Sequence, residues 1–312
     1  MEKGIELHHK MGYNDKNIYV YGGLQTMTLR QYFDSLKSKT VAVIGIGVSN
    51  TPLLRLLLRE GICVTACDKR ERSALGELAD ELEKGGCRLQ LGADYLHGLH
   101  EDVIFRTPGL RPDVPELLQA QQQGSELTSE MEVFFSVCPC TLIAVTGSDG
   151  KTTTTTIIAE LLKAAGKTVH VGGNIGNPLL CQADEMRPED YAVLELSSFQ
   201  LMTMRQSPHI AVVTNLAPNH LDMHKDMAEY VAAKENIFRY QKAGDIAVFN
   251  LDNDITREQA ERAVGRVRTF SRRQEPTDGV FLRGESIISS QNGQERVVMQ
   301  TQDIRLPGVH NV

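Results

Sequence analysis

The chain has 312 residues and a net charge of −7 at pH 7, with 41% hydrophobic and 23% charged residues. This length fits two domains that can each bury a core, and the acidic balance argues against nucleic acid as the main partner. No apolar run approaches the roughly 20 residues that span a bilayer, so we expect no membrane association.

Cysteine usage and the first residues favour a cytoplasmic protein. The six cysteines fit no zinc-binding spacing, so we expect reduced thiols. The first thirty residues lack the hydrophobic centre of a signal peptide. Residues 1–26 show no clear periodicity and predict a mobile leader, followed by a first domain over 27–139.

The first domain opens with a strand–helix–strand unit. After a short capped helix over 28–36, an apolar strand from Val41 enters a glycine turn, a leucine-rich helix follows, and the next strand ends on Asp68. The spacing imitates a dinucleotide fingerprint, but Asn50 occupies the place of its third glycine. NAD binding stays open beside a second interpretation, a diphosphate at the turn with its nucleoside nearby. The residues expected to bind it are Gly47, Val48, Ser49, Asn50, Thr51, Asp68, Lys69 and Arg70.

Further alternation of strands and helices completes this domain. We predict a charged helix over 73–84, strands over 88–91 and 102–106, and a helix through Gln123. Thr107, Pro108 and Gly109 close the last strand in a sharp turn. The pattern restarts near Pro139, and we place the domain boundary there.

The second domain, 140–312, begins with a candidate phosphate loop. A β-branched strand over 141–145 leads into Gly-Ser-Asp-Gly-Lys-Thr-Thr, and an apolar-faced helix follows. A helix N-terminus suits a phosphate, Lys151 is placed to reach its oxygens, and the Thr152 hydroxyl suits Mg²⁺. Val145 stands where the Walker pattern has its first glycine, so an ordinary strand–turn–helix junction is the alternative.

The remaining elements of the second domain continue the α/β pattern. Strands are expected over 168–173, 191–196, 209–215 and 246–250, with a helix over 227–240. From Arg266 onward, short alternating runs predict an antiparallel edge. The expected fold class is therefore α/β: a Rossmann-like N-terminal domain, then a P-loop-type central domain with a mainly parallel sheet, helices on both faces and a small antiparallel edge.

Polar residues follow several of these strands, at the edge where an open parallel sheet binds ligands. They include Asn174, Glu195 and His220. Glu195 ends an apolar strand, and a buried carboxylate needs a cation; Mg²⁺ is favoured beside a phosphate loop, with a salt bridge as the alternative. His220 is either a second metal ligand or an ordinary loop histidine. Lys234 is either solvated or packed closely enough to lower the pKa of its amine.

Several motifs together resemble the Mur ligase family in order and spacing. The resemblance spans about residues 27–312 and is most specific in the second domain. The motifs are Thr-Gly-Ser-Asp-Gly-Lys-Thr-Thr at 146–153, Gly-Gly-Asn-Ile-Gly-Asn-Pro at 172–178, Leu-Glu-Leu-Ser-Ser-Phe-Gln-Leu at 194–201, Asn-His-Leu-Asp at 219–222, Ala-Ala-Lys at 232–234 and Leu-Pro-Gly-Val-His-Asn at 306–311.

The resemblance implies an ATP-dependent carbon–nitrogen ligase of peptidoglycan synthesis. Ser-Ser-Phe-Gln-Leu resembles the branch that adds D-glutamate to UDP-N-acetylmuramoyl-L-alanine through an acyl phosphate. Lys151, Glu195, His220 and Lys234 would then be catalytic, and two Mg²⁺ ions would be held by Thr152, Glu195, His220 and a carboxylated Lys234. ATP would contact Gly147, Ser148, Asp149, Gly150, Lys151, Thr152, Thr153, Thr154 and Asn311, and the substrate would contact the first-domain residues named above with Asn174, Ser197 and Gln200.

Two departures from the family pattern qualify these expectations. Asp149 stands where asparagine is usual, which places an extra negative charge beside the phosphates. The family's C-terminal domain, which receives D-glutamate, is expected to be absent, so this chain, a monomer, would be inactive alone. Another Mur ligase or a folylpolyglutamate synthase-like ligase shares the loop, and a non-catalytic NAD-sensing Rossmann protein is the remaining alternative.

Overall fold

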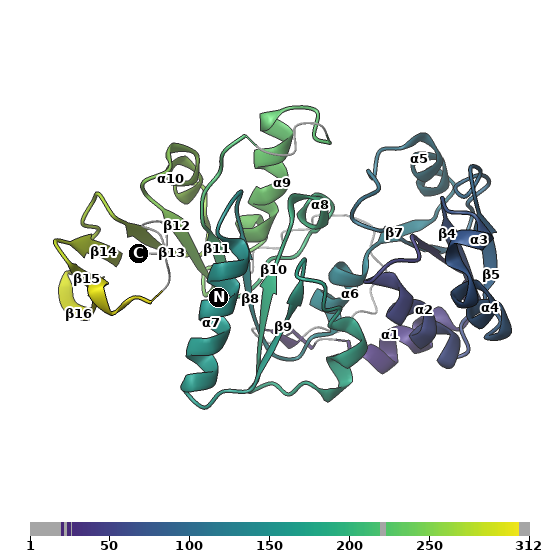
Figure 1. The fold of residues 1–312 in the computed structure, drawn as a ribbon, viewed down its shortest axis with the longest axis horizontal. Coiled ribbons are helices and arrows are strands. Elements are labelled where there is room, and N and C mark those ends of the chain that lie inside the picture. The colour runs from purple at the N-terminus through teal and green to yellow at the C-terminus, as the bar shows by residue number, and fades with distance from the viewer. Residues whose placement is uncertain (1–19, 22–23, 26, 219–222, 306–312) are drawn as a thin grey trace, which may run out of the picture.

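The computed structural model describes residues 20–21, 24–25, 27–218 and 223–305. Most of the expected leader and the predicted site residues His220 and Asn311 lie outside these residues. Two α/β domains lie side by side along the long axis, and β13–β16 lie at the end far from the first domain (Figure 1). Val20–Tyr21 (β1) and Leu24–Gln25 (β2) form a short antiparallel pair.

The first domain is built on five parallel strands in the order β5-β4-β3-β6-β7. Val41 and Val43 of β3 pack with the core that includes α1 and α2, and Ala42 and Ile44 pack with α5 on the other face. The strands are β3 (Val41–Ile44), β4 (Val64–Asp68), β5 (Arg88–Leu91), β6 (Val103–Phe105) and β7 (Glu126–Thr128). Both faces are covered, as a parallel sheet requires.

The helices of this domain match the predicted ones with one break and one addition. They are α1 (Leu29–Leu36), α2 (Asn50–Arg59), α3 (Arg72–Leu75), α4 (Glu77–Lys84), α5 (Pro115–Gln122) and α6 (Glu130–Val137). The single helix expected over 73–84 is interrupted because Gly76 has φ 54°, which no α-helix accommodates. Thr28 caps α1 through a reciprocal capping box with Gln31.

The central domain carries nine strands in the order β16-β15-β14-β13-β12-β11-β8-β10-β9. They are β8 (Thr141–Thr146), β9 (Val169–Gly173), β10 (Tyr191–Glu195), β11 (Ile210–Val213), β12 (Ile246–Asn250), β13 (Arg266–Ser271), β14 (Gly279–Arg283), β15 (Ser286–Gln291) and β16 (Gln294–Gln300). Helices α7 (Lys151–Ala164), α8 (Ser198–Leu201), α9 (Met227–Arg239) and α10 (Asp254–Ala260) and the 3₁₀ turns η1 (Leu180–Glu185) and η2 (Thr301–Asp303) complete the domain.

The α/β class with an antiparallel edge is confirmed, but the edge is smaller than expected. The runs after Arg266 were all expected to be antiparallel, whereas β13 and β14 extend the parallel part of the sheet and only β15 and β16 are antiparallel. The connection between the parallel strands β13 and β14 needs a loop of only seven residues. This short loop is sufficient because β14 begins opposite Thr269 and pairs with β13 over only three residues.

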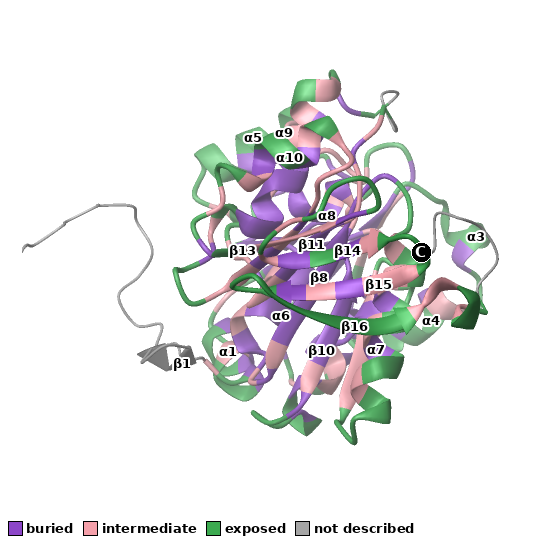
Figure 2. Cartoon of the chain, turned by 90° about the vertical axis from the view of Figure 1, so that its left-hand side faces the viewer, coloured by how far each residue is buried: buried purple, intermediate pink, exposed green. Residues whose placement is uncertain are grey.

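Burial follows this layering. The inner strands of the central sheet are largely buried, whereas β16 is exposed at the edge (Figure 2). All six cysteines are free thiols, and four of them are buried. Within the described residues, no helix combines the length and apolar character needed to cross a membrane.

Candidate active site

The glycine loop between β8 and α7 is held against the end of β11. Ser148 donates its N–H to the Asn215 carbonyl oxygen at 2.9 Å, and the Thr214 hydroxyl donates to the Asp149 carbonyl oxygen at 2.6 Å. A Cβ on Gly147, whose φ is 155°, would lie 1.9 Å from that hydroxyl oxygen. Only glycine fits at this position, and the loop therefore presents its backbone at the N-terminus of α7.

The Asp149 side chain faces the Asn215 side chain, outside the loop. Its backbone N–H donates to Asn215 Oδ1 at 2.9 Å, and its Oδ2 lies 3.4 Å from Asn215 Nδ2. The residue is exposed. The extra carboxylate is therefore turned toward the neighbouring amide and is screened by solvent.

Two lysine amines converge on one carbonyl oxygen of the loop. Lys151 Nζ donates to Gly147 O at 3.0 Å and to Ser148 O at 2.9 Å. Lys234 Nζ, from α9, donates to the same Gly147 O at 3.0 Å and to Thr146 Oγ1 at 3.1 Å. Burial, with repulsion from Lys151, lowers the pKa of the Lys234 amine to about 7.

Helix α9 also carries an aromatic ring to the loop. Tyr230 lies one turn before Lys234, whose amine is 4.9 Å from the ring centroid. The Tyr230 hydroxyl lies 2.9 Å from Ser148 Oγ. The loop is thus fixed from α9 as well as from β11.

Glu195 lies beside α7 at the end of β10. The Thr152 hydroxyl donates to its Oε2 at 2.6 Å, and Asn174 Nδ2 donates to its Oε1 at 2.8 Å. The carboxylate is 3% exposed, and among the described residues no lysine, arginine or histidine forms an ion pair with it. A carboxylate, a hydroxyl and an amide oxygen are hard ligands that fit Mg²⁺, so these residues suit the expected ion.

The described part of the chain contains no group of three His, Cys, Asp or Glu residues placed to bind a metal. His220, the expected ligand for a second ion, lies outside it. A site for that ion therefore stays a prediction.

Ser197 and Gln200, expected at the substrate, form the N-terminal cap of α8. The Ser197 hydroxyl accepts the Gln200 N–H at 3.3 Å, and Gln200 Oε1 accepts the Ser197 N–H at 3.0 Å. The cap fixes the turn that follows Glu195, and Ser197 stays half-buried at the sheet edge.

In the first domain, Asp68 organises the glycine turn. Its Oδ2 accepts the Ile46 N–H at 2.7 Å, and Arg70 donates to both of its oxygens at 2.8–2.9 Å. Burial alone would raise the pKa of this carboxyl, but the bonds from Arg70 and Ile46 hold it at about 2. Gly45 meets Thr107, since a Cβ at Gly45 would be 3.0 Å from the threonine Cβ. The turns expected to bind the diphosphate therefore lie together, with Lys69 and Arg70 exposed beside them.

Some residues of this arrangement were not predicted from the sequence. Tyr230 could have been found from its spacing of four residues before Lys234 on a helix. Thr214 and Asn215 follow an apolar strand, as the other site residues do, and that position was the available signal. Arg111 and Glu229 gave no signal in the sequence, because their contact crosses between domains. His224 contacts Glu229 and Ser198 within the central domain.

A model of the Mur ligase middle domain matches residues 145–312, which is more than half of the chain. The chain belongs to the Mur ligase family. A model of the MurD-like N-terminal domain of Mur ligases also matches residues 39–129.

This chain is 50% identical over 286 residues to UDP-N-acetylmuramoylalanine--D-glutamate ligase of Clostridium novyi, covering 91% of this chain and 62% of that protein. It is also 50% identical over 285 residues to the same ligase of Acetivibrio thermocellus, covering 91% of this chain and 61% of that protein. The chain therefore spans about three-fifths of the length of these curated relatives.

A solved structure shares the fold at low sequence identity. The UDP-N-acetylmuramate:L-alanyl-gamma-D-glutamyl-meso-diaminopimelate ligase of Neisseria meningitides superposes with a TM-score of 0.55 at 19% identity, covering 88% of this chain and 89% of the other. At this identity the likeness supports the architecture alone.

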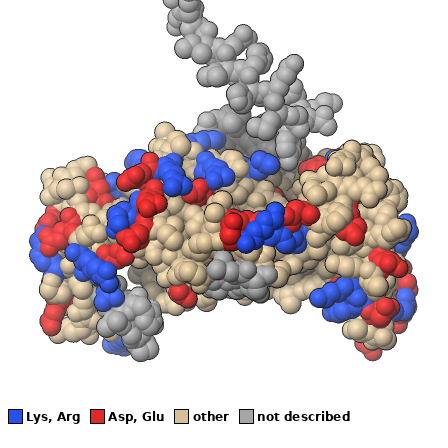
Figure 3. Space-filling view, turned by 90° about the horizontal axis from the view of Figure 1, so that it is seen from above, with Lys and Arg blue, Asp and Glu red and all other residues tan. Residues whose placement is uncertain are grey.

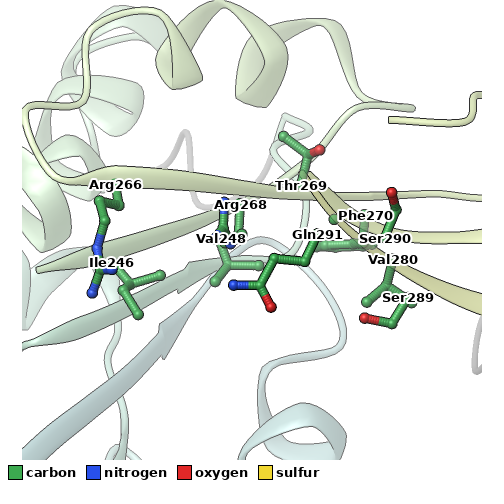
Figure 4. Close-up of a pocket in the computed structure, with 11 residues that line it drawn as sticks. Ile246, Val248, Arg266, Arg268, Thr269, Phe270, Val280, Ser289, Ser290 and Gln291 are labelled. Atoms are coloured by element: carbon green, nitrogen blue, oxygen red, sulfur yellow. The ribbon is translucent and has the colours of Figure 1, made fainter. Parts of the chain in front are cut away.

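A separate hollow of about 450 Å³ lies over the sheet surface between β12 and β15 (Figure 4). Ile246, Val248, Arg268 and Gln291 are among the residues that line it. None of the residues around Gly147 or Glu195 lines this hollow, so it is not part of the site described above.

Proposed function

We propose that this Mur ligase joins D-glutamate to UDP-N-acetylmuramoyl-L-alanine at the expense of ATP, in cytoplasmic peptidoglycan precursor synthesis. The convergence of Lys151 and Lys234 on the Gly147 carbonyl, beside Glu195 and Thr152, carries the proposal. The 50% identity to two D-glutamate ligases supports this substrate over those of other family members.

The proposed reaction has two steps. The alanyl carboxylate attacks the γ-phosphorus of ATP, the bond to the β-phosphate oxygen breaks, and ADP leaves an acyl phosphate. The amine of D-glutamate then attacks the acyl carbon, the new C–N bond forms, phosphate leaves, and the amine gives up a proton. Lys151, which donates to two loop carbonyl oxygens, would turn to the β- and γ-phosphates and offset their charge.

Mg²⁺ would supply charge neutralisation at the phosphates. Thr152 and Glu195 would hold one ion. His220 and a carboxylated Lys234 would hold a second, and the lowered pKa of Lys234 supports the neutral amine that carboxylation requires.

The other proposed contacts between the chain and its ligands are inferred from where the residues lie in the fold. The turns at 47–51, 68–70 and 107–109 would bind the uridine diphosphate part. Asn174, Ser197 and Gln200 would lie near the reacting carboxyl group, and Asn311 near the adenine. Since the relatives extend well beyond the matched length, we also propose that D-glutamate binds mainly outside these residues and that the 312-residue monomer turns over poorly by itself.

Isothermal titration calorimetry of the 312-residue chain tests the proposal. UDP-N-acetylmuramoyl-L-alanine and a non-hydrolysable ATP analogue with Mg²⁺ should each bind, and Lys151→Met should abolish only the nucleotide binding. Tetrahydrofolate binding in place of the UDP-sugar would favour a folylpolyglutamate synthase-like ligase. Binding of NADH without either expected ligand would favour a NAD-sensing Rossmann protein.

A further inference from the structure

An arginine of the first domain reaches across to the helix that carries Lys234. Arg111 donates from Nη1 and Nη2 to the two carboxylate oxygens of Glu229 at 2.9 and 2.8 Å. Its Nη1 also donates to the Met223 carbonyl oxygen at 2.7 Å. Glu229 lies in the first turn of α9, so this contact joins the two domains at the start of that helix.

Two further charges complete the cluster. Asp113 accepts from Arg111 Nε at 2.8 Å, and Lys225 Nζ lies 3.0 Å from the other Asp113 oxygen. Hydrogen bonds from Arg111 lower the pKa of the Glu229 carboxyl to about 2. Two positive and two negative groups therefore balance at neutral pH, and charged side chains of both signs gather between the domains on the upper face (Figure 3).

His224 continues the contact to α8, next to the proposed substrate residues Ser197 and Gln200. Its side chain is fully buried, its ring stacks on Phe199 at 5.1 Å, and Nε2 lies 2.9 Å from Ser198 Oγ. Nδ1 lies 3.4 Å from Glu229 Oε2 without hydrogen-bond geometry, and it has no other partner among the described residues. Burial lowers the pKa of His224, so we assign a neutral ring that accepts from Ser198 and directs Nδ1–H toward Glu229.

The same ring leads to the phosphate loop. His224 meets the edge of Tyr230 at 5.3 Å between centroids, and the Tyr230 hydroxyl lies 2.9 Å from Ser148 Oγ. Contacts of described residues thus run without a gap from Arg111 to the loop that is proposed to bind ATP.

The turn at 107–110 is tied to the central domain at both ends. Before it, the buried Arg106 donates to the carbonyl oxygens of Thr107 and Leu110, and its Nη2 donates to the Phe199 carbonyl oxygen at 3.2 Å. After it comes Arg111. Displacement of this turn by a ligand in the first domain would therefore shift both α8 and the start of α9.

The turns at 47–51, 68–70 and 107–109 form the first-domain cradle. We propose that Arg111, acting through Glu229 and His224, is a positioning residue that couples ligand binding in this cradle to the phosphate loop. The proposal rests on the proposed function, because it requires a UDP-sugar in the cradle and ATP at the loop. Arg111 is not among the residues proposed to contact either ligand. Its effect is on how strongly one ligand strengthens the binding of the other.

Calorimetry with both ligands measures this coupling directly. The dissociation constant of a non-hydrolysable ATP analogue is determined with and without saturating UDP-N-acetylmuramoyl-L-alanine, at one ionic strength. In the native chain the UDP-sugar should tighten nucleotide binding about tenfold, within the usual range of coupling between sites. Arg111→Met and Glu229→Gln should each reduce this factor to about one, with the affinity for each ligand alone changed less than about twofold.

Two further variants separate positioning from a structural role. Arg111→Lys should restore part of the coupling, because it keeps the charge but not the bidentate contact. Arg55→Met, which removes an exposed ion pair with Glu81 elsewhere in the first domain, should leave the coupling intact. Native-like melting temperatures establish that the variants fold.

The outcomes are distinct. Full coupling in Arg111→Met, or equal loss of both single-ligand affinities with the coupling retained, overturns the positioning role. Binding of both ligands to the native chain without coupling also overturns it and leaves the proposed function standing. Binding of neither ligand to the native chain overturns the proposed function and the positioning role together.

Discussion

Two lysines share the Gly147 carbonyl oxygen, but their surroundings give them different chemistry. Lys151 lies half-buried at the start of α7, whereas Lys234 is 2% exposed. Removal from water disfavours the charged amine, and the neighbouring Lys151 adds repulsion, so the pKa of Lys234 falls to about 7. At neutral pH the Lys234 amine is therefore neutral in about half of the protein molecules, whereas an ordinary lysine is neutral in well under 1%.

This difference predicts selective carboxylation of Lys234. Its neutral nitrogen attacks CO₂, one N–H proton passes to water, and a carbamate forms. In ¹³C NMR with labelled bicarbonate we expect a Lys234 carbamate signal, distinct from that of the chain's α-amine, that grows as the pH rises from 6 to 8, following the deprotonation of the Lys234 amine. The signal should vanish in Lys234→Arg and persist in Lys151→Arg. Its survival in the Lys234 variant would assign it elsewhere and contradict the prediction.

At the scale of elements, the glycine loop between β8 and α7 is held by hydrogen bonds to the two residues that follow β11. Gly147 has no room for a side chain because Thr214 and the Asn215 backbone lie against it. We expect Gly147→Ala to push the loop off β11, to lower stability by about 2 kcal/mol, and to abolish binding of the ATP analogue.

Gly244→Ala is the matched control for that change. A Cβ there meets nothing within 4 Å, so stability and nucleotide binding should both be native-like. Differential scanning fluorimetry and calorimetry measure the two effects. Native affinity in Gly147→Ala would show that the loop tolerates the displacement and that Thr214 does not set its shape.

The sequence was a good guide to elements whose signals are local. The capped helix that begins at Thr28, the strand over 246–250 and the glycine loop all appear where their residues predict them. Gly76 was passed over because a single glycine inside a charged helical run also fits an unbroken helix. Helix α6 was missed because it is buried on most sides and includes a buried glutamate, Glu130, so its residues do not show the hydrophobic period of a surface helix.

The candidate site likewise contains residues that the sequence predicts and contacts that it does not. Lys151, Thr152, Asn174 and Glu195 follow strands, so the topology of a parallel sheet alone predicts that they meet. The partners of Asp68 and the capping role of Ser197 required coordinates, because side chains choose among several nearby donors. No pattern in one domain predicts Arg111, since its partner lies 118 residues away in the other.

At the scale of the whole molecule, the two domains also meet through a buried acid. Glu130, in the first turn of α6, is 6% exposed, and its Oε1 accepts the Leu180 N–H of η1 at 2.9 Å. Burial raises the pKa of this carboxyl to about 7, and the single hydrogen bond offsets only part of the effect. Glu130 is therefore mostly protonated in the folded chain at pH 6, when the same side chain in the unfolded chain is ionised.

This difference makes the stability of the folded chain depend on pH in a definite direction. Between the unfolded value near 4.5 and the folded value near 7 the folded state holds the extra proton, so Glu130 stabilises it fully below pH 4.5, and this contribution is lost as the pH rises through 7. Glu130→Gln keeps an acceptor for Leu180 but cannot ionise. We therefore expect the variant to exceed the native chain in free energy of unfolding by about 1–3 kcal/mol at pH 8 and to match it at pH 4.5. Urea unfolding at both values measures this, with the exposed Glu77→Gln as the control, and an equal change at the two pH values would show that ionisation of Glu130 is not its cause.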